Sequence, residues 1–254
     1  IFSLLSSPLW SWPTARLFLR RAWLKGLNEL KAWIGTALVP ARAWIEAGYK
    51  SLEVQALLAP WVLHTGLNPE STYSGQMGRV IAFALEAAGA PIVKGGAENA
   101  SKAFRSLIEA HGGEVRTEVE AKRIITENGK VIALETAEGE RIKADSIIAS
   151  VTPSQLYGEL LHDTSHREDF DPSLFRHGRG NFQLHYALSG DPEWHAEGLE
   201  DVALIHLADG IDSVSKSSNE AERGLLPEAP TICVGQPHKL DPSRCPPGKG
   251  ILWV

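Results

Sequence analysis

The sequence lacks the features that mark several special classes of protein. Its two cysteines, Cys233 and Cys245, are too few for a disulfide framework and form neither a CxxC pair nor a zinc pattern. No apolar run approaches the roughly 18 residues that a membrane-spanning helix needs. The net charge is −6, so the basic surplus of a nucleic-acid-binding protein is absent. We therefore expect a globular protein of a reducing, cytoplasmic compartment, without a nucleic-acid partner.

Short catalytic signatures are missing too. The sequence has no GxSxG, HExxH, Walker A or GxGxxG pattern. His162 and His166 stand four residues apart, a ligand spacing on a helix, but the acidic residues and proline around them favour a solvated loop. His185 and His206 fall on expected strands, where each could line a pocket or be a hydrogen-bonded interior histidine. We predict no metal site and assign no catalytic residue.

The length and composition are those of a globular chain with a substantial core. The sequence has 254 residues, of which 43% are hydrophobic and 22% charged, enough for one large domain or two ordinary ones. It begins with Ile1 and ends with "GILWV", which reads as the middle of a strand. We therefore expect the chain to be a piece of a longer protein.

The first third of the sequence has helical periodicity. From Leu19 to Leu38 apolar residues recur at steps of three and four, which predicts one helix from an N-cap at Thr14 to Pro40. A second helix is expected over residues 41–64, bent or ended by Pro60. Residues 75–90 are apolar almost all round, which predicts a buried helix.

Tryptophan is concentrated in this helical part. Six of the eight tryptophans precede residue 62, on helices that also carry arginine and lysine. Helix packing with a solvated basic face accounts for this pattern. A membrane-surface patch and an apolar tunnel for a long substrate account for it as well. Peripheral membrane contact is therefore kept as an alternative.

After residue 90 the periodicity changes from helical to strand-like. A helix is expected over residues 97–110, and the segment 122–134 reads as a hairpin with Asn128-Gly129 at its tip. A second reversal follows at Glu138-Gly139, and the apolar run 145–150 predicts a buried strand. A short helix is then expected from Pro153, and further strands are expected near residues 181–190, 201–209 and 230–237, with a helix between the last two.

Two adjacent glycines, Gly95 and Gly96, directly precede the helix over residues 97–110. Exposed amides at a helix N-terminus can bind phosphate. A dinucleotide fingerprint, however, needs a strand before the glycines, and here a helix and an Ala-Pro turn come first. Paired glycines otherwise indicate positive φ or a close backbone approach. The residues alone favour a tight turn.

The ordered set of these segments resembles a known enzyme family. The stretch from "APIVKGGAENASKAF" to "ADSIIASVTP", residues 90–153, is similar to the central part of the phytoene desaturase-like FAD-dependent oxidoreductases, within the wider amine oxidase group. "HTGLNPES" resembles the loop before it, and "NFQLHYALSGDPEW" and "PTICVGQPHKLDPSRCPPGKG" resemble later substrate-domain strands. The resemblance covers most of the chain after residue 50.

The resemblance implies FAD as cofactor and places a few residues near it. The adenosine end would contact the main chain at Ala121, where the family usually has valine, with Val119 and Lys122 as neighbours. Residues 150–153 would return toward the cofactor. The Gly95-Gly96 turn would cross from the substrate domain to the FAD domain near the flavin ring, and Asn99 would line the substrate cavity. The family's GxGxxG unit and its C-terminal flavin segment have no counterpart in this sequence.

We therefore expect an α/β fold, α+β by element count, in which a partial FAD-binding domain with a small antiparallel meander joins a helical and mixed-sheet substrate domain. Residues 1–90 and 154–254 would form the substrate domain, and residues 91–153 the FAD-binding part. The expected function is FAD-dependent dehydrogenation, desaturation or isomerisation of an apolar, polyene-like substrate. The alternative is a catalytically inactive binding or scaffold protein. The meander would expose apolar surface, which a homodimer could cover.

Overall fold

The computed structural model describes residue 8, residues 10–161 and residues 171–254. The chain divides into two compact units, one of residues 1–97 with 179–254 and the other of residues 98–178. Both helices and strands are present, and the described strands form two small antiparallel sheets, so the chain is a mixed α and β protein. The division at residues 90 and 153 stays a prediction, and the His162–His166 pair lies outside the described residues.

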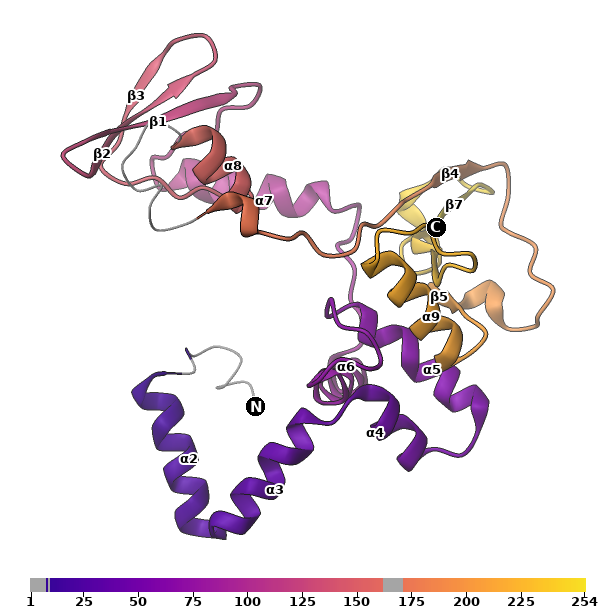
Figure 1. Ribbon diagram of the computed structural model, residues 1–254. Helices are drawn as coiled ribbons and strands as arrows, with labels where there is room; N and C mark the ends of the chain where they lie inside the picture. Colours follow the sequence, from indigo (N-terminus) through magenta and orange to yellow (C-terminus); the bar gives the residue numbers. More distant parts are fainter. Residues whose placement is uncertain (1–7, 9, 162–170) are drawn as a thin grey trace. The chain divides into compact units, whose positions relative to one another are not determined.

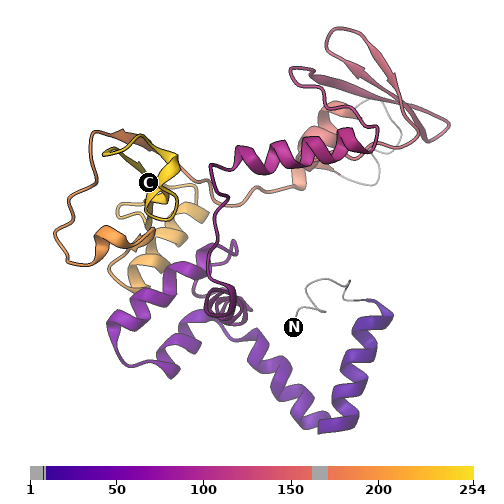
Figure 2. The same cartoon turned by 180° about the vertical axis from the view of Figure 1, so that it is seen from behind.

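Two helices, α2 (Trp12–Lys25) and α3 (Leu27–Leu38), stand where one continuous helix was predicted. The two helices meet at a sharp bend, visible in both views (Figures 1 and 2), and Gly26 is the residue between them. Gly26 has φ of 85°, a left-handed conformation that glycine adopts without strain, and its N–H donates to the Ala22 carbonyl at 2.8 Å. The predicted N-cap was also wrong: Ser11 caps α2 by accepting from the Thr14 N–H.

The predicted helix over residues 41–64 is likewise two helices, α4 (Ala41–Gly48) and α5 (Leu52–Leu63). Ser51 begins α5, because its hydroxyl oxygen accepts from the Val54 N–H at 3.3 Å. Pro60 does not end α5, which continues to Leu63. The restart at Ser51 turns one long helix into two short ones that can pack on the same core.

Helix α6 (Ser74–Ala88) was expected to be buried, and this is wrong for most of its length. Its buried residues are at the start, where Gly75 and Gly78 allow close approach to the backbone before α4 and to the Trp44 ring. A Cβ on Gly75 would lie 2.7 Å from the Val39 carbonyl oxygen. The later part is open, and Phe83 is 60% exposed. An apolar sequence predicts the tendency to be buried but not the neighbour that would cover it.

The core of the larger unit lies where α4, α5 and α9 (Ile211–Glu222) meet (Figure 1). Six small and branched apolar side chains form this core: Ala41, Ile45, Ala59, Val62, Ile211 and Val214. Trp44 and Leu58 pack against it from the rim. The core therefore joins the N-terminal helices to a helix of the strand-rich part.

The same unit contains a four-stranded antiparallel sheet with the order β4-β7-β6-β5. Its strands, all of four residues, are β4 (His185–Leu188), β5 (Leu204–Leu207), β6 (Ile232–Gly235) and β7 (Gly250–Trp253). Short 3-10 turns lie between them at Leu199–Asp201, Pro237–Lys239 and Pro242–Arg244. The predicted strands and the helix α9 are confirmed, although β4 is shorter than its alternating pattern.

The smaller unit begins with α7 (Glu98–Ala110) and continues into the sheet β1 (Ala121–Glu127), β2 (Lys130–Thr136) and β3 (Arg141–Lys143). The predicted hairpin is confirmed, with positive φ at Asn128 and Gly129 as a type I′ turn requires. α8 (Pro153–Gln155) runs into a π-helical turn (Leu156–Leu160), and a 3-10 turn (Pro172–Leu174) follows the undescribed segment.

The buried strand predicted over residues 145–150 is wrong. This stretch has no strand conformation, and Ile148 is fully exposed. An apolar run becomes a buried strand only when a sheet lies beside it, and no described strand pairs with these residues. The exposed apolar surface expected near the meander is present here.

Candidate functional site

The Gly95-Gly96 turn is held by a carboxylate from the far end of the chain. The Gly95 N–H donates to Asp241 Oδ2 at 2.6 Å, and the Gly96 N–H donates to the Val93 carbonyl at 3.2 Å. Both glycines have positive φ, 77° and 115°. Because both amides already have acceptors within the chain, the pair does not offer two open N–H groups to a phosphate. The structure agrees with a turn rather than a phosphate cradle.

Asp241 is itself almost completely buried, with 6% of its surface exposed. Its Oδ1 accepts from the Ser243 hydroxyl at 2.6 Å, and its Oδ2 also accepts from Arg244 Nε at 3.1 Å. The hydrogen bonds from Ser243 and from the Gly95 N–H hold the pKa of Asp241 well below its ordinary value. Asp241 is therefore an anion at neutral pH.

Arg244 completes this contact by donating from its terminal NH2 group to the Val93 carbonyl at 2.6 Å. Asp241 and Arg244 thus hydrogen-bond to the main chain on both sides of Lys94, at Gly95 and at Val93. Sequence reasoning missed both residues. The "DPSR" segment predicts a local cap, seen in the hydrogen bond from the Ser243 N–H to Asp241. Nothing local in it indicates a partner 146 residues away.

The residues predicted for the adenosine end lie together at the start of β1. Ala121 is the first residue of the strand, and Lys122 falls at a register shift between Ala121 and Arg123, a bulge in the β1–β2 pairing. Val119 is half-buried, whereas Ala121 and Lys122 are exposed. In the described sheet β1 is an edge strand, so part of its main chain faces away from β2. As an edge strand, β1 is compatible with the predicted main-chain contact to a cofactor.

Asn99 lies in the first turn of α7 and is exposed. It belongs to the smaller unit with Val119, Ala121 and Lys122, whereas Gly95 and Gly96 belong to the larger one. The structure therefore has Val119, Ala121 and Lys122 together at the start of β1 and places the glycines with Asp241. The cofactor and cavity roles of these six residues stay predictions.

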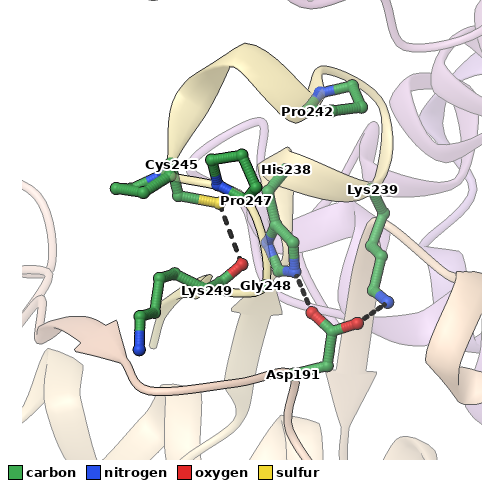
Figure 3. Close-up of a pocket in the computed structure, with 9 residues that line it drawn as sticks. Asp191, His238, Lys239, Pro242, Cys245, Pro247, Gly248 and Lys249 are labelled. Carbon is green, nitrogen blue, oxygen red and sulfur yellow. Dashed lines mark hydrogen bonds and ion pairs between the residues drawn. The ribbon is translucent and has the colours of Figure 1, made fainter.

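A second polar site, missed by the sequence analysis, centres on Asp191 in the loop after β4 (Figure 3). Asp191 lies between Lys239 Nζ and His238 Nε2, each 2.7 Å from a carboxylate oxygen. His238 Nδ1 accepts from the Ile251 N–H at 3.3 Å, so Nε2 carries the proton and donates to Asp191. Lys239, and then His238, hold the pKa of Asp191 below its ordinary value.

This pocket is better suited to holding loops together than to acid–base chemistry. Both imidazole nitrogens of His238 are already hydrogen-bonded, and Cys245 Sγ donates to the Lys249 carbonyl at 3.0 Å (Figure 3). A general base needs a nitrogen that is free to accept a proton from substrate. The contacts instead join the loop before β7 to the loop after β4.

The histidines left open by the sequence have different surroundings. His185 is exposed on β4. His206 on β5 is half-buried, and its Nε2 lies 2.9 Å from Nε2 of His64. His206 is therefore a hydrogen-bonded histidine with a second titratable side chain beside it.

The tryptophan-rich helices leave an apolar surface open along α2. Trp12 and Trp23 are 73% and 90% exposed, and Trp12, Arg16, Leu19, Arg20, Trp23 and Leu24 line a shallow groove. On the other side of the helix, Arg21 stacks over the Trp33 ring at 4.6 Å. In the part of the chain that the structure describes, no helix is long and apolar enough to cross a membrane.

Comparison with known proteins gives the family. The profile described as flavin containing amine oxidoreductase matches residues 51–253, which include both described sheets. The chain belongs to this family. Because the family is described as flavin-containing, membership implies FAD as the cofactor, in agreement with the resemblance of the central segment to FAD-dependent oxidoreductases.

Three curated relatives share modest sequence identity with this chain of the amine oxidoreductase family. One of the subunits of limonene dehydrogenase from Castellaniella defragrans is 29% identical over 85% of this chain and 43% of its own length. Hydroxyneurosporene desaturase of Rubrivivax gelatinosus is 28% identical over 47% of this chain and 22% of its own length. For 4,4'-diapolycopene oxygenase of a Methylomonas species the identity is 26%, over 64% of this chain and 31% of its own length. The chain spans less than half the length of each.

Two solved structures share the fold. An oxidoreductase from Methanosarcina mazei superposes with a TM-score of 0.56 at 16% identity, covering 84% of this chain and 46% of that one. A protein from Pyrococcus furiosus also superposes with a TM-score of 0.56, at 18% identity, covering 92% of this chain and 54% of that one. At these identities the likeness concerns the fold alone.

Proposed function

We propose that the protein is an FAD-dependent oxidoreductase that dehydrogenates, desaturates or isomerises an apolar, polyene-like substrate. The observation that carries this proposal is the family match over residues 51–253. The names of the relatives support the substrate class, because they describe a dehydrogenase, a desaturase and an oxygenase of limonene, hydroxyneurosporene and diapolycopene.

The residues at the start of β1 fit one end of the cofactor. A main-chain N–H and C=O can hold an adenine edge whatever the side chain is, so alanine in place of the usual valine at Ala121 is compatible with this role. The bulge at Lys122 interrupts the pairing with β2 at the same place. The sequence has no GxGxxG, the motif through which the family binds the pyrophosphate, so we assign that contact to none of these residues.

The Gly95-Gly96 turn would serve as the crossing beside the flavin. Asp241 and Arg244 hold the turn in one conformation, and glycine keeps bulky side chains out of the space next to it. When bound, FAD accepts a hydride from a substrate C–H bond, and the protein positions the substrate and excludes water. That division of work explains why an acid–base dyad is not required of this chain.

The proposal is tested with the full-length protein by absorbance and by FAD titration. We expect a yellow protein whose flavin is bleached anaerobically by an apolar polyene. Ala121→Pro removes the main-chain N–H at the first residue of a strand, where proline is tolerated, and we expect at least about tenfold weaker FAD binding. Ala121→Val is the matched control and should bind FAD as the wild type does.

Two outcomes would count against this proposal in different ways. A full-length protein that purifies colourless and does not respond to added FAD would exclude the flavoenzyme. A protein that binds FAD but neither is bleached by nor isomerises any member of a panel of apolar substrates would favour the catalytically inactive binding or scaffold alternative. The homodimer stays a prediction, with sedimentation of the same sample as its test.

A further inference from the structure

Three side chains with metal-binding atoms converge at one end of the four-stranded sheet. His64 is the C-cap of α5, His206 is on β5 and Cys233 is on β6. His206 and Cys233 are directly opposite each other in the β5–β6 register, so their side chains lie on the same face of the sheet. All three residues belong to the larger unit.

The ligand atoms are close enough to share one ion. His64 Nε2 and His206 Nε2 are 2.9 Å apart, and these two nitrogens and Cys233 Sγ all lie within 4.8 Å of one another. Trp61 supports the pair, stacking on the His64 ring at 5.2 Å and meeting the His206 ring edge-on at 4.6 Å. The indole restricts the rotamers of both imidazoles and so limits the entropy that an ion would have to overcome.

We propose that His64, His206 and Cys233 form a zinc site. Zinc bonds of about 2.0–2.1 Å to nitrogen and about 2.3 Å to sulfur place tetrahedral ligand atoms roughly 3.3–3.6 Å apart. The two nitrogens, now 2.9 Å apart, need to separate slightly, and the sulfur already lies within 4.8 Å of both. Water would complete four-coordination on the exposed His64 side, which is also the route of entry.

The chemistry of the ligand set favours a borderline cation over a hard one. Two imidazoles and a thiolate suit zinc, whereas magnesium and calcium prefer oxygen ligands. The 2.9 Å contact between His64 Nε2 and His206 Nε2 requires one of the two nitrogens to accept, so at least one ring is neutral and offers a lone pair. Burial raises the pKa of the Cys233 thiol, and zinc binding would release that proton to solvent.

The site would join the end of α5 to the sheet. Ala59 and Val62 of α5 already pack in the helical core, and the ion would add a link from the next turn to both β5 and β6. This is a structural role in the substrate-domain part of the chain, and it does not depend on the proposed oxidoreductase activity. It also differs from the expectation from sequence, which contained no metal site.

The experiment is a cobalt titration of the full-length protein after removal of metal with a chelator. We expect one Co²⁺ per chain, a thiolate-to-cobalt charge-transfer band in the near ultraviolet, displacement of that band by Zn²⁺ and a higher Tm with Zn²⁺. Mg²⁺ should produce none of these changes. Absence of a stoichiometric charge-transfer band in the folded wild-type protein would overturn the site.

Variants assign the ligands. Cys233→Ser should abolish the charge-transfer band, and His206→Gln should weaken cobalt binding by at least about tenfold. Cys245→Ser is the matched control, because Cys245 lies in the proline-rich loop with its thiol bonded to the Lys249 carbonyl. Each variant is compared with wild type by circular dichroism in chelator, which separates loss of a ligand from loss of the fold. A band that survives Cys233→Ser, or is lost with Cys245→Ser, would contradict the assignment.

Discussion

At the scale of single residues, Asp241 is the side chain that ties its own loop to the Gly95-Gly96 turn. Its carboxylate is buried, accepts hydrogen bonds from its own loop and from Arg244, and reaches the Gly95 N–H. A buried carboxylate is stable only when such donors surround it. Because one of these donors belongs to the Gly95-Gly96 turn, Asp241 links the loop before β7 to that turn.

Asp241→Asn tests this coupling through pH. The folded-state pKa of Asp241 lies below the ordinary value of 3.8, so its stabilising contribution is complete above that pH and is lost as the pH falls below it toward the folded-state pKa. We expect the variant to have a Tm a few degrees lower at pH 7, and the difference from wild type to narrow below about pH 4. Asp201→Asn, an exposed carboxylate in the same unit, is the control. A pH-independent difference would contradict the argument.

At the scale of elements, close packing depends on glycine where two strands or helices approach. Gly235 at the end of β6 is opposite Trp253 of β7, and a Cβ there would lie 1.9 Å from the indole ring. Trp194 donates to the buried Gln236 side chain at 3.1 Å, so the neighbouring residue is also fixed. At this β6–β7 pairing the Trp253 ring occupies the space that a Cβ on residue 235 would need.

Gly235→Ala should therefore destabilise the larger unit. An added methyl group in a packed site typically costs about 1–3 kcal/mol. We expect a lower midpoint in urea unfolding followed by tryptophan fluorescence, since Trp253 is displaced. Gly180→Ala is the matched control, because a Cβ at Gly180 meets nothing within 4 Å and its φ is not positive. Equal effects of the two substitutions would show that packing against Trp253 is not the cause.

At the scale of the whole molecule, the open groove on α2 is a surface that combines apolar and basic side chains. Trp12, Leu19, Trp23 and Leu24 alternate with arginines along it, and the α2 sequence contains four basic residues and no acidic one. Amphipathic helices that lie at a membrane surface combine exposed tryptophan and leucine with arginine in this way. The groove thus favours the membrane-surface alternative over the tunnel, and the membrane contact remains a prediction.

Vesicle flotation tests this surface. We expect the full-length protein to float with anionic phosphatidylserine vesicles and less with zwitterionic ones, because the arginines favour negative headgroups. Replacing Trp12 and Trp23 by alanine should reduce binding by at least about tenfold, since each exposed indole contributes apolar area. Phe182→Ala removes an aromatic residue that is 85% exposed elsewhere and should have no effect. Failure of the wild-type protein to float would remove the membrane alternative.

Much of the fold was predictable where neighbouring residues decide it. The hairpin follows from Asn128-Gly129, which accept positive φ, the short strands follow from their alternating or continuous apolar residues, and α7 and α9 lie where helices were expected. The predicted elements were wrong where a local signal, such as a glycine or an N-cap serine, competes with the spacing of apolar residues. Gly26 and Ser51 broke helices that the apolar spacing had joined, and the apolar run 145–150 did not form the strand that its composition indicated.

The sequence by itself determined the family resemblance, the helix-then-strand order and the glycine turn, because each depends on residues that are adjacent along the chain. Only the tertiary structure decided which groups meet. Asp241 reaches Gly95, and His64 joins His206 and Cys233, across separations that no spacing rule covers. These contacts depend on how α5 and the loop before β7 pack against the sheet, and that packing is set by burial and shape rather than by any local pattern.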